Sequence, residues 1–239
     1  MTNKYNMFAH NCDATSLIGD DACLYLASGQ IAYTSARPDL LIASELTICQ
    51  RMYLVNRATY ADVLNCCTPG LTYQNYMLYF SSTDIPIFAF THAGGTATLS
   101  ATTSVSRGHW NDIVVRSSVA GVTVRFNING AYNSVARGTA NVAHTAATSR
   151  VILGKLLANR KFEGYIKDLV IYDRCLTDDE VKIFERGGIP HGFAAYWPMG
   201  EATGLKINDW SHSRNNLKMS NGASFLTLGY NPQKAFIWG

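Results

Sequence analysis

The alternation of hydrophobic and polar positions predicts β-strands along most of the chain. From residue 122 to 128, the hydrophobic residues Val, Val, Phe and Ile alternate with Thr, Arg and Asn. This period of two is typical of a strand with one face in a core and one face in solvent. The run ends at Asn129-Gly130, a sequence typical of tight turns, and the β-type run 110–116 precedes it. We therefore predict a hairpin here.

Further β-type runs, divided by turn-forming residues, are 46–55, 60–67, 71–80, 85–90, 151–153 and 162–172. Pro86 places the start of its run at a strand entry or a sheet edge. One segment has helical features, because Thr177-Asp-Asp-Glu180 forms a capping box and Gly187-Gly188 ends the apolar run behind it. Many short strands and one short helix near 177–186 predict an all-β fold, a two-sheet antiparallel β-sandwich.

Composition narrows the class of protein. The chain has 239 residues, which is enough for one large all-β domain. Charged residues make up 15% and the formal net charge is +3, so we expect no nucleic-acid partner, which would call for a marked basic excess. No stretch of about 18 apolar residues occurs, so we expect no membrane insertion.

The N-terminus and the cysteines bear on the folding compartment. The first 20 residues contain no apolar run of the kind that a secretory signal peptide needs, so we expect no signal peptide. The six cysteines form no C-x-x-C pair. We predict buried free thiols in a protein that folds in a reducing cytosol.

Two stretches carry a family resemblance. Residues 162–181 read F-E-G-Y-I-K-D-L-V-I-Y-D-R-C-L-T-D-D-E-V, and 195–204 read A-Y-W-P-M-G-E-A-T-G, with N-D-W-S-H-S-R-N-N following at 208–216. Together with the hairpin around Trp110, they resemble laminin-G-like domains of the concanavalin A-like lectin and glucanase superfamily. The resemblance implies a concanavalin A-like jelly roll.

The order of these stretches departs from the family pattern. The second stretch resembles the family's opening strand, yet it lies near the C-terminus, at 193–228. We predict a circular permutation or a strand supplied to a neighbouring copy. We expect a single domain over 22–239, an N-terminal arm over 1–21, and an apolar tail at 234–239 that docks on its own domain or on a partner.

The sequence predicts a protein without catalytic activity. Some members of the superfamily hydrolyse β-glucans through an E-x-D-x-x-E strand. The five glutamates here form no E-x-D sequence: Glu45, Glu163, Glu180, Glu185 and Glu201. The six histidines are scattered and have no metal-ligand spacing. A glycoside hydrolase is therefore the weakest alternative.

Calcium is the one cofactor that the resemblance implies. Lectin and pentraxin relatives bind calcium through carboxylate, amide and backbone oxygens, which are its preferred ligands. Asp209, Asn215 and Asn216 match the family's loop, and Glu201 is expected nearby. In the alternative interpretation, these side chains only tie the turn through hydrogen bonds to the backbone.

Glycan recognition requires planar polar groups and aromatic rings that stack on sugar faces. The outer face of the central hairpin and the exposed loops offer such groups, and the candidate ligand-binding residues are Arg125, Asn127, Asn129, Tyr132, Trp210 and His212, with Arg137 a further loop residue. The alternative is a polar sheet face or a subunit contact.

We predict a non-catalytic binding or assembly module. The superfamily acts mostly outside cells, whereas this chain shows no signal peptide. A virion surface component (a capsid decoration, fibre or tail protein) combines folding in the cytosol with exposure after lysis. Its expected partners are further copies of itself or other virion proteins, and glycans. The alternative is a calcium-dependent carbohydrate-binding lectin or adhesin.

Overall fold

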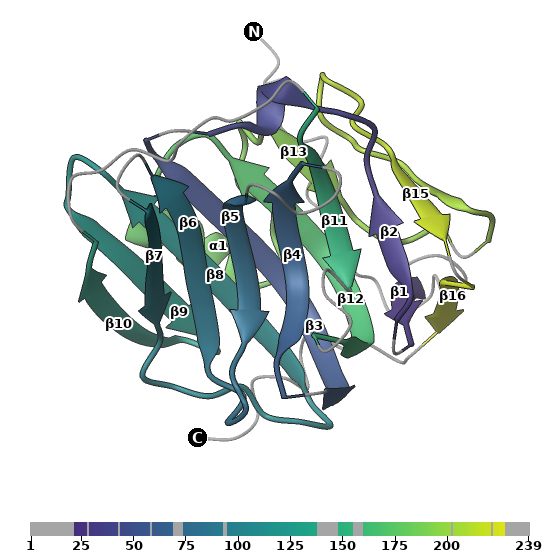
Figure 1. The fold of residues 1–239 in the computed structure, drawn as a ribbon, viewed down its shortest axis with the longest axis horizontal. Helices are drawn as coiled ribbons and strands as arrows, with labels where there is room; N and C mark the ends of the chain where they lie inside the picture. Colours follow the sequence, from purple (N-terminus) through teal and green to yellow (C-terminus); the bar gives the residue numbers. More distant parts are fainter. Residues whose placement is uncertain are drawn as a thin grey trace, which may run out of the picture.

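The fold is a sandwich of two antiparallel β-sheets with one α-helix on its outside (Figure 1). The computed structural model describes residues 22–27, 29–42, 44–57, 59–68, 74–92, 95–137, 148–154, 160–201, 203–220 and 222–227. The predicted all-β sandwich is confirmed. The predictions for the arm 1–21 and for the tail 234–239 lie outside the described residues.

The first sheet carries the helix. Its strand order is β10 (Ala131–Ala136), β9 (Thr123–Ile128), β8 (Trp110–Ser118), β3 (Leu46–Arg57), β12 (Phe162–Tyr172), β1 (Ala22–Leu26) and β16 (Ser224–Thr227), and β13 (Ala195–Trp197) also pairs with β12. Successive side chains point to its two faces, apart from register shifts where β12 pairs with β3. In β9, for example, Val124, Phe126 and Ile128 are buried in the core, while Arg125 and Asn127 face outward.

The second sheet lies in front of the first in Figure 1. Its order is β14 (Lys206–Ile207), β15 (Leu217–Ser220), β2 (Ile31–Tyr33), β11 (Arg150–Gly154), β4 (Ala61–Cys67), β5 (Gln74–Phe80), β6 (Pro86–His92) and β7 (Gly95–Ser100). A short 3-10 turn, η1 (Pro38–Leu40), follows β2. The inner faces of both sheets share one hydrophobic core, which includes the fully buried Trp197 and Phe88.

The C-terminal segment contributes strands to both sheets of its own chain. β13 pairs with β12, β16 with β1, and β15 with β2. The described strands of 193–228 therefore pair within the chain. The circular permutation and the strand exchange both stay predictions.

Helix α1 (Asp178–Glu185) packs on the outer face of the first sheet. The predicted capping box is present, because the Thr177 side chain accepts a hydrogen bond from the Glu180 N–H and the Glu180 carboxylate accepts one from the Thr177 N–H. Val181 and Phe184 form its buried stripe. They pack against outward-facing side chains of three central strands, Cys49, Val114 and Val170.

The cysteines of the described residues are free thiols, as predicted. Cys23, Cys49, Cys66 and Cys67 are buried, and Cys175 is half-buried. Burial raises the pKa of Cys66 to about 12 and that of Cys67 to about 11, so both stay protonated at neutral pH. Among the described residues, no helix has the length and apolar character needed to cross a bilayer.

Candidate functional site

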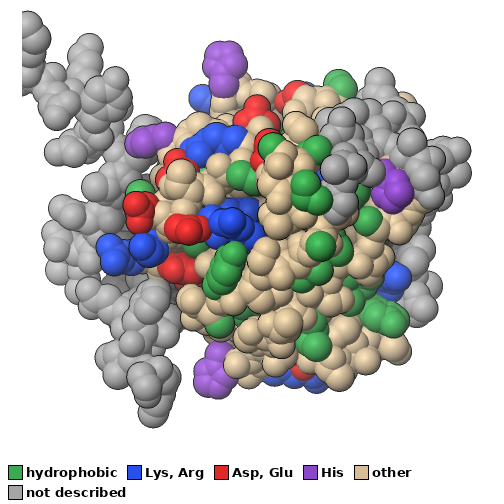
Figure 2. All heavy atoms as spheres, turned by 90° about the vertical axis from the view of Figure 1, so that its left-hand side faces the viewer, with side chains coloured by type: hydrophobic (Ala, Val, Ile, Leu, Met, Phe, Trp, Pro, Cys, Tyr) green, Lys and Arg blue, Asp and Glu red, His purple; other side chains and the backbone are tan. Residues whose placement is uncertain are grey.

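A groove of about 440 Å³ lies between the outer face of the β9–β10 hairpin and helix α1. Ligand pockets commonly have volumes of about 300–1,000 Å³. Figure 2 looks onto the side of the molecule formed by β7 and β10 and shows acidic and basic side chains gathered in its left half. The hairpin contributes Arg125, Asn127, Gly130 and Tyr132 to the groove, and the helix contributes Asp178, Val181, Lys182 and Glu185.

The hairpin wall follows directly from strand alternation. Arg125 and Asn127 occupy the outward positions of β9, and Tyr132 stands opposite Asn127 on β10. Tyr132 is 53% exposed, and the Arg125 guanidinium carbon lies 5.9 Å from the centre of its ring. A cationic group and an exposed aromatic ring therefore stand side by side.

Arg116 of β8 joins the two walls of the groove from below. Its buried guanidinium donates to the Asp178 carboxylate at 2.5 Å, to the Leu176 carbonyl at 3.0 Å and to the Asn127 side-chain oxygen at 3.2 Å. Asp178 and Leu176 belong to the start of the helix, and Asn127 belongs to the hairpin. Arg116 thus connects the helix to the hairpin, and the Arg125 guanidinium of the hairpin also lies 3.9 Å from the Asp178 carboxylate.

The groove contains charges of both signs. The hydrogen bond from Arg116 lowers the pKa of Asp178, so that carboxylate stays ionised. Burial raises the pKa of Glu185, and one of its carboxylate oxygens is buried without a hydrogen-bond partner. Lys182 donates to Asp179 at 3.1 Å on the exposed side of the helix. Two acids and two bases balance each other in the groove wall, which suits an uncharged polar ligand.

The structure brings three of the six predicted ligand residues together, namely Arg125, Asn127 and Tyr132. Asn129 lies beside the groove in the turn that ends β9. Its side-chain oxygen accepts from the Asp112 N–H at 2.8 Å and its amide donates to Asn111 at 3.0 Å, so its role is to fix the turn.

Trp210 and His212 lie elsewhere, in the loop 208–216. The Trp210 ring packs edge-on against Tyr196 at 5.9 Å. Arg137 is buried and stacks on Phe90 at 4.3 Å, so it is no exposed loop residue as the sequence suggested. A loop position after a strand does not reveal whether its side chain turns inward.

The sequence did not identify the helix residues that form the second wall of the groove. In the sequence, Asp178 and Asp179 belong to the capping sequence at the helix N-terminus, where acidic residues are favourable. The spacing of Asp178, Lys182 and Glu185 places them along one face of a helix, because positions three and four apart are neighbours. That spacing could have identified a polar helix face, although nothing local shows which strand it meets.

Asp209 is fully buried at the centre of the loop that was compared with calcium sites. Its Oδ1 accepts from the N–H groups of Tyr196 and Ser211, and its Oδ2 accepts from the Ser211 hydroxyl and the Asn215 N–H, at 2.6–2.9 Å. A carboxylate has about four acceptor positions, and here all are used. Asp209 in this conformation makes the hydrogen bonds that the turn-tying interpretation expects.

The other three residues of the predicted calcium set also contact the protein. Glu201 accepts from the Asn208 N–H at 2.6 Å, Asn216 accepts from the Asp209 N–H at 2.9 Å, and the Asn215 amide donates to Asp39 at 2.9 Å. Within the described residues, no group of three or more His, Cys, Asp and Glu side chains is placed to bind a metal ion. Calcium binding here stays a prediction.

The sequence matches one family, Laminin_G_3, described as the concanavalin A-like lectin/glucanases superfamily, over residues 28–182. The match covers β2 to most of α1, including the whole hairpin wall of the groove. A search of curated protein sequences finds no match.

Solved structures share the fold at low sequence identity. A Bacteroides ovatus protein proposed to bind carbohydrate matches with a TM-score of 0.68 and 14% identity. The match covers 89% of this chain and 61% of the Bacteroides protein. The heptameric SAP-like pentraxin of Limulus polyphemus matches with 0.61 and 16%, over 88% of this chain and 96% of its own. The Ruminococcus gnavus IT-sialidase CBM40 bound to α2,3-sialyllactose matches with 0.57 and 14%, over 68% and 96%.

Proposed function

The chain belongs to the concanavalin A-like lectin/glucanases superfamily, and from that premise we propose that it is a non-catalytic module that binds glycans in the groove between α1 and the β9–β10 hairpin. One observation carries the proposal. Three side chains of the type that sugars require, Arg125, Asn127 and Tyr132, converge in one groove with the polar face of a helix.

The groove has the chemistry of a sugar site. The Tyr132 ring offers an exposed face for the C–H groups of a pyranose, and Arg125 beside it offers a planar set of donors for neighbouring hydroxyls. The unpartnered oxygen of Glu185 is an acceptor that a ligand hydroxyl can satisfy. The balanced charges favour a neutral hexose over an acidic one.

The spacing of the two acids argues against hydrolysis. Asp178 and Glu185 are the carboxyl groups of the groove, and their pKa values are shifted in opposite directions, as in an acid–base pair. They lie seven positions apart on one helix, which separates their backbones by about 10 Å. Glycosidases place their two carboxyls about 5–9.5 Å apart on opposite sides of the bond. Two acids on a single wall do not flank a bound sugar.

The test is a glycan-array screen of the native protein, followed by titration of any glycan it binds to Tyr132→Ala and Arg125→Ala. We expect each variant to lose about tenfold or more in affinity. Tyr33→Ala is the matched control, since Tyr33 is a half-buried tyrosine on the outer face of the second sheet. No bound glycan, or equal affinity in all variants, contradicts the proposal. Reducing-sugar release would instead indicate an enzyme.

As a second function we propose assembly on a virion surface. The likeness to a heptameric pentraxin over most of both chains supports association between copies. Ile183 on the helix and Leu205 before β14 are 48% and 70% exposed, so they are the positions at which a contact between copies is tested. Sedimentation of the full chain tests it. A defined oligomer that Ile183→Ser or Leu205→Ser dissociates supports assembly, whereas a monomer at all concentrations contradicts it.

A further inference from the structure

Four aromatic side chains form a row across four neighbouring strands of the first sheet. From β1 to β8 they are Tyr25, Tyr165, Tyr53 and Trp110, which we call the aromatic row. Each residue stands directly opposite the next in the strand register. The ring centres are 4.9, 5.7 and 6.0 Å apart along the row. The spacing follows from the distance of about 4.8 Å between neighbouring strands.

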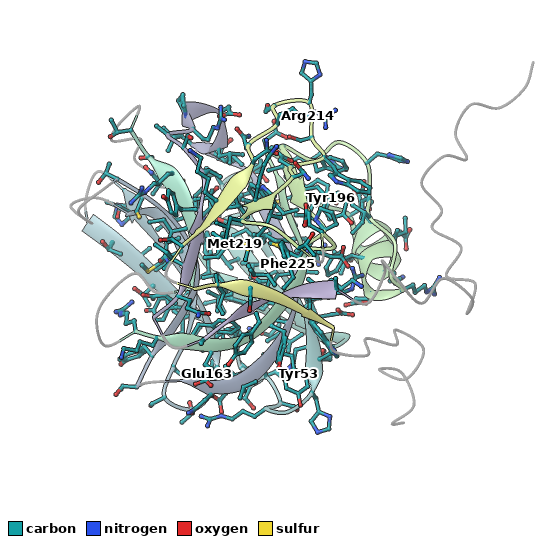
Figure 3. The ribbon with its side chains drawn as sticks, turned by 90° about the vertical axis from the view of Figure 1, so that its right-hand side faces the viewer. Tyr53, Glu163, Tyr196, Arg214, Met219 and Phe225 are labelled. Carbon is teal, nitrogen blue, oxygen red and sulfur yellow. The ribbon has the colours of Figure 1, made fainter. Side chains whose placement is uncertain are left out.

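The aromatic row lies on the outer face of the first sheet, the face that carries α1. The residues before and after Tyr25 and Tyr53 point into the core, so these tyrosines point outward. All four members of the row are half-buried. Figure 3 shows Tyr53 at the lower end of the molecule and Tyr196 above it, beside the helix. The row therefore occupies the part of the face beyond the end of α1.

The Trp110 end of the row leads to the groove. Two positions after Trp110 on the same face, Asp112 exchanges hydrogen bonds with Asn129, donating to its side chain at 2.8 Å and accepting from its N–H at 3.0 Å. Asn129 is followed by Gly130, which lines the groove. Row and groove therefore lie on the same outer face and are linked at this turn, and we treat them together as one surface.

We propose that this surface binds one extended, β-linked polysaccharide of neutral hexoses, with the groove taking one sugar and the aromatic row taking the sugars that follow. This rests on the function proposed above and adds its ligand class. A groove alone would select a terminal sugar or a short oligosaccharide. A straight row of rings at intervals close to the length of a sugar unit favours a long, extended chain.

The shape of the row favours a glycan over a protein partner. A stable protein interface buries about 800 Å² on each side around a broad apolar centre. The row is one residue wide, and two charged residues of β12, Glu163 and Lys167, lie on its face on either side of Tyr165. A sugar chain has the same character, with apolar ring faces and a polar rim.

The tilt of the rings limits how many sugars can stack. Tyr165 and Tyr53 meet at 87°, and Tyr53 and Trp110 at 72°, so neighbouring rings do not present parallel faces. Neighbouring rings therefore cannot all stack on consecutive sugars of one chain, and those that do not stack contribute edges and hydroxyl groups. We therefore expect the affinity to increase with every second sugar added to the chain and not with every single sugar.

The experiment measures affinity against chain length. Di-, tetra- and hexasaccharides of β-1,4-glucan, β-1,4-mannan and chitin are titrated into the full-length protein and into Tyr165→Ala, Tyr53→Ala and Tyr33→Ala. For at least one series we expect the hexasaccharide to bind about tenfold more tightly than the disaccharide. Tyr165→Ala and Tyr53→Ala should remove this gain and leave disaccharide affinity unchanged, while Tyr33→Ala should change neither.

The outcomes separate the two proposals. If the short sugars bind through Tyr132 and the affinity does not rise with chain length in any series, the proposal of an extended ligand is wrong and the proposal of a glycan site in the groove is supported. If no sugar of any length binds, both are wrong. If Tyr165→Ala changes the sedimentation of the protein and not its sugar affinity, the row is a contact between proteins. Tyr165→Leu, which keeps the apolar bulk and removes the ring, replaces Tyr165→Ala if the alanine variant does not fold.

Discussion

The guanidinium carbon of Arg51 lies 4.0 Å from the centre of the Phe184 ring, and the same side chain donates a hydrogen bond to the Phe184 carbonyl. Arg51 comes from β3 and is 1% exposed. It also contacts Asp168 at 2.8 Å and Asp112 at 3.3 Å. The C-terminal end of α1, whose carbonyl groups favour a cation, is thereby attached to the sheet by one buried arginine.

Replacing Arg51 should destabilise the fold strongly. Arg51→Met leaves the carboxylates of Asp112 and Asp168 in a buried place without their cation, which costs about 3–5 kcal/mol. Urea unfolding monitored by circular dichroism measures the loss. Arg107→Met is the control, because Arg107 pairs with Asp84 at the surface, where an ion pair contributes about 0–1 kcal/mol. Equal losses in both variants would contradict a special role for the buried pair.

Arg116 should position the groove as well as stabilise it. Arg116→Lys keeps a charge but cannot reach Asp178, Leu176 and Asn127 together. We expect unfolding free energy to fall by about 1–3 kcal/mol and glycan affinity to fall about tenfold. Arg150→Lys is the matched control, since Arg150 stacks on Tyr33 at 4.9 Å on the second sheet. Unchanged glycan titration of Arg116→Lys would show that the groove does not depend on this contact.

Local pattern predicted the hairpin, because β9 alternates between buried and half-buried side chains and a tight-turn sequence follows it, whereas in β8 all side chains from Ile113 to Ser117 are buried. It failed for β10 and β7, whose side chains are mostly exposed or half-exposed. An edge strand pairs through its backbone and needs no hydrophobic alternation, so the sequence between 131 and 136 gave no β-pattern. The same exposure that hid β10 makes its Tyr132 available to a ligand.

Only the hairpin wall of the candidate site could be predicted from the sequence, because the helix wall depends on contacts between distant residues. The outward residues of β9 were identified from alternation alone. The helix wall depends on contacts such as that between Arg116 and Asp178, which are 62 positions apart in the chain. A hydrophobic pattern shows that an arginine faces away from the core. It does not show which distant carboxylate it meets, or that a helix will cover it.

Asp112 should make stability depend on pH. Burial raises its pKa from 3.8 to about 6, although Arg51 opposes this. Between pH ~4 and ~6 the folded protein binds a proton that the unfolded chain has lost, so stability falls as pH rises through this window. A shift of two pKa units corresponds to at most about 3 kcal/mol.

Asp112→Asn removes the titration and tests the assignment. The difference in melting temperature between the native protein and this variant should change across pH 4–6 and be constant above pH 7. Arg51, Asp168 and Glu185 also face Asp112, and the pKa of Glu185 is raised in the same direction. Glu185→Gln therefore serves as the control for the part of the pH dependence that comes from Glu185. If the difference in melting temperature is the same at every pH, a group other than Asp112 is responsible for the pH dependence.

The calcium prediction can be decided at Asp209, because the two interpretations of its loop give opposite results. If the carboxylate ties the turn, Asp209→Ala leaves the N–H groups of Tyr196, Ser211 and Asn215 without their acceptor and costs about 3 kcal/mol or more. EDTA then leaves the melting temperature of the native protein unchanged, and Asp209→Asn, which keeps an acceptor oxygen, recovers part of the loss. This is the result we expect from the four hydrogen bonds. A native protein that calcium stabilises and EDTA destabilises, with Asp209→Asn insensitive to both, would instead establish a calcium site.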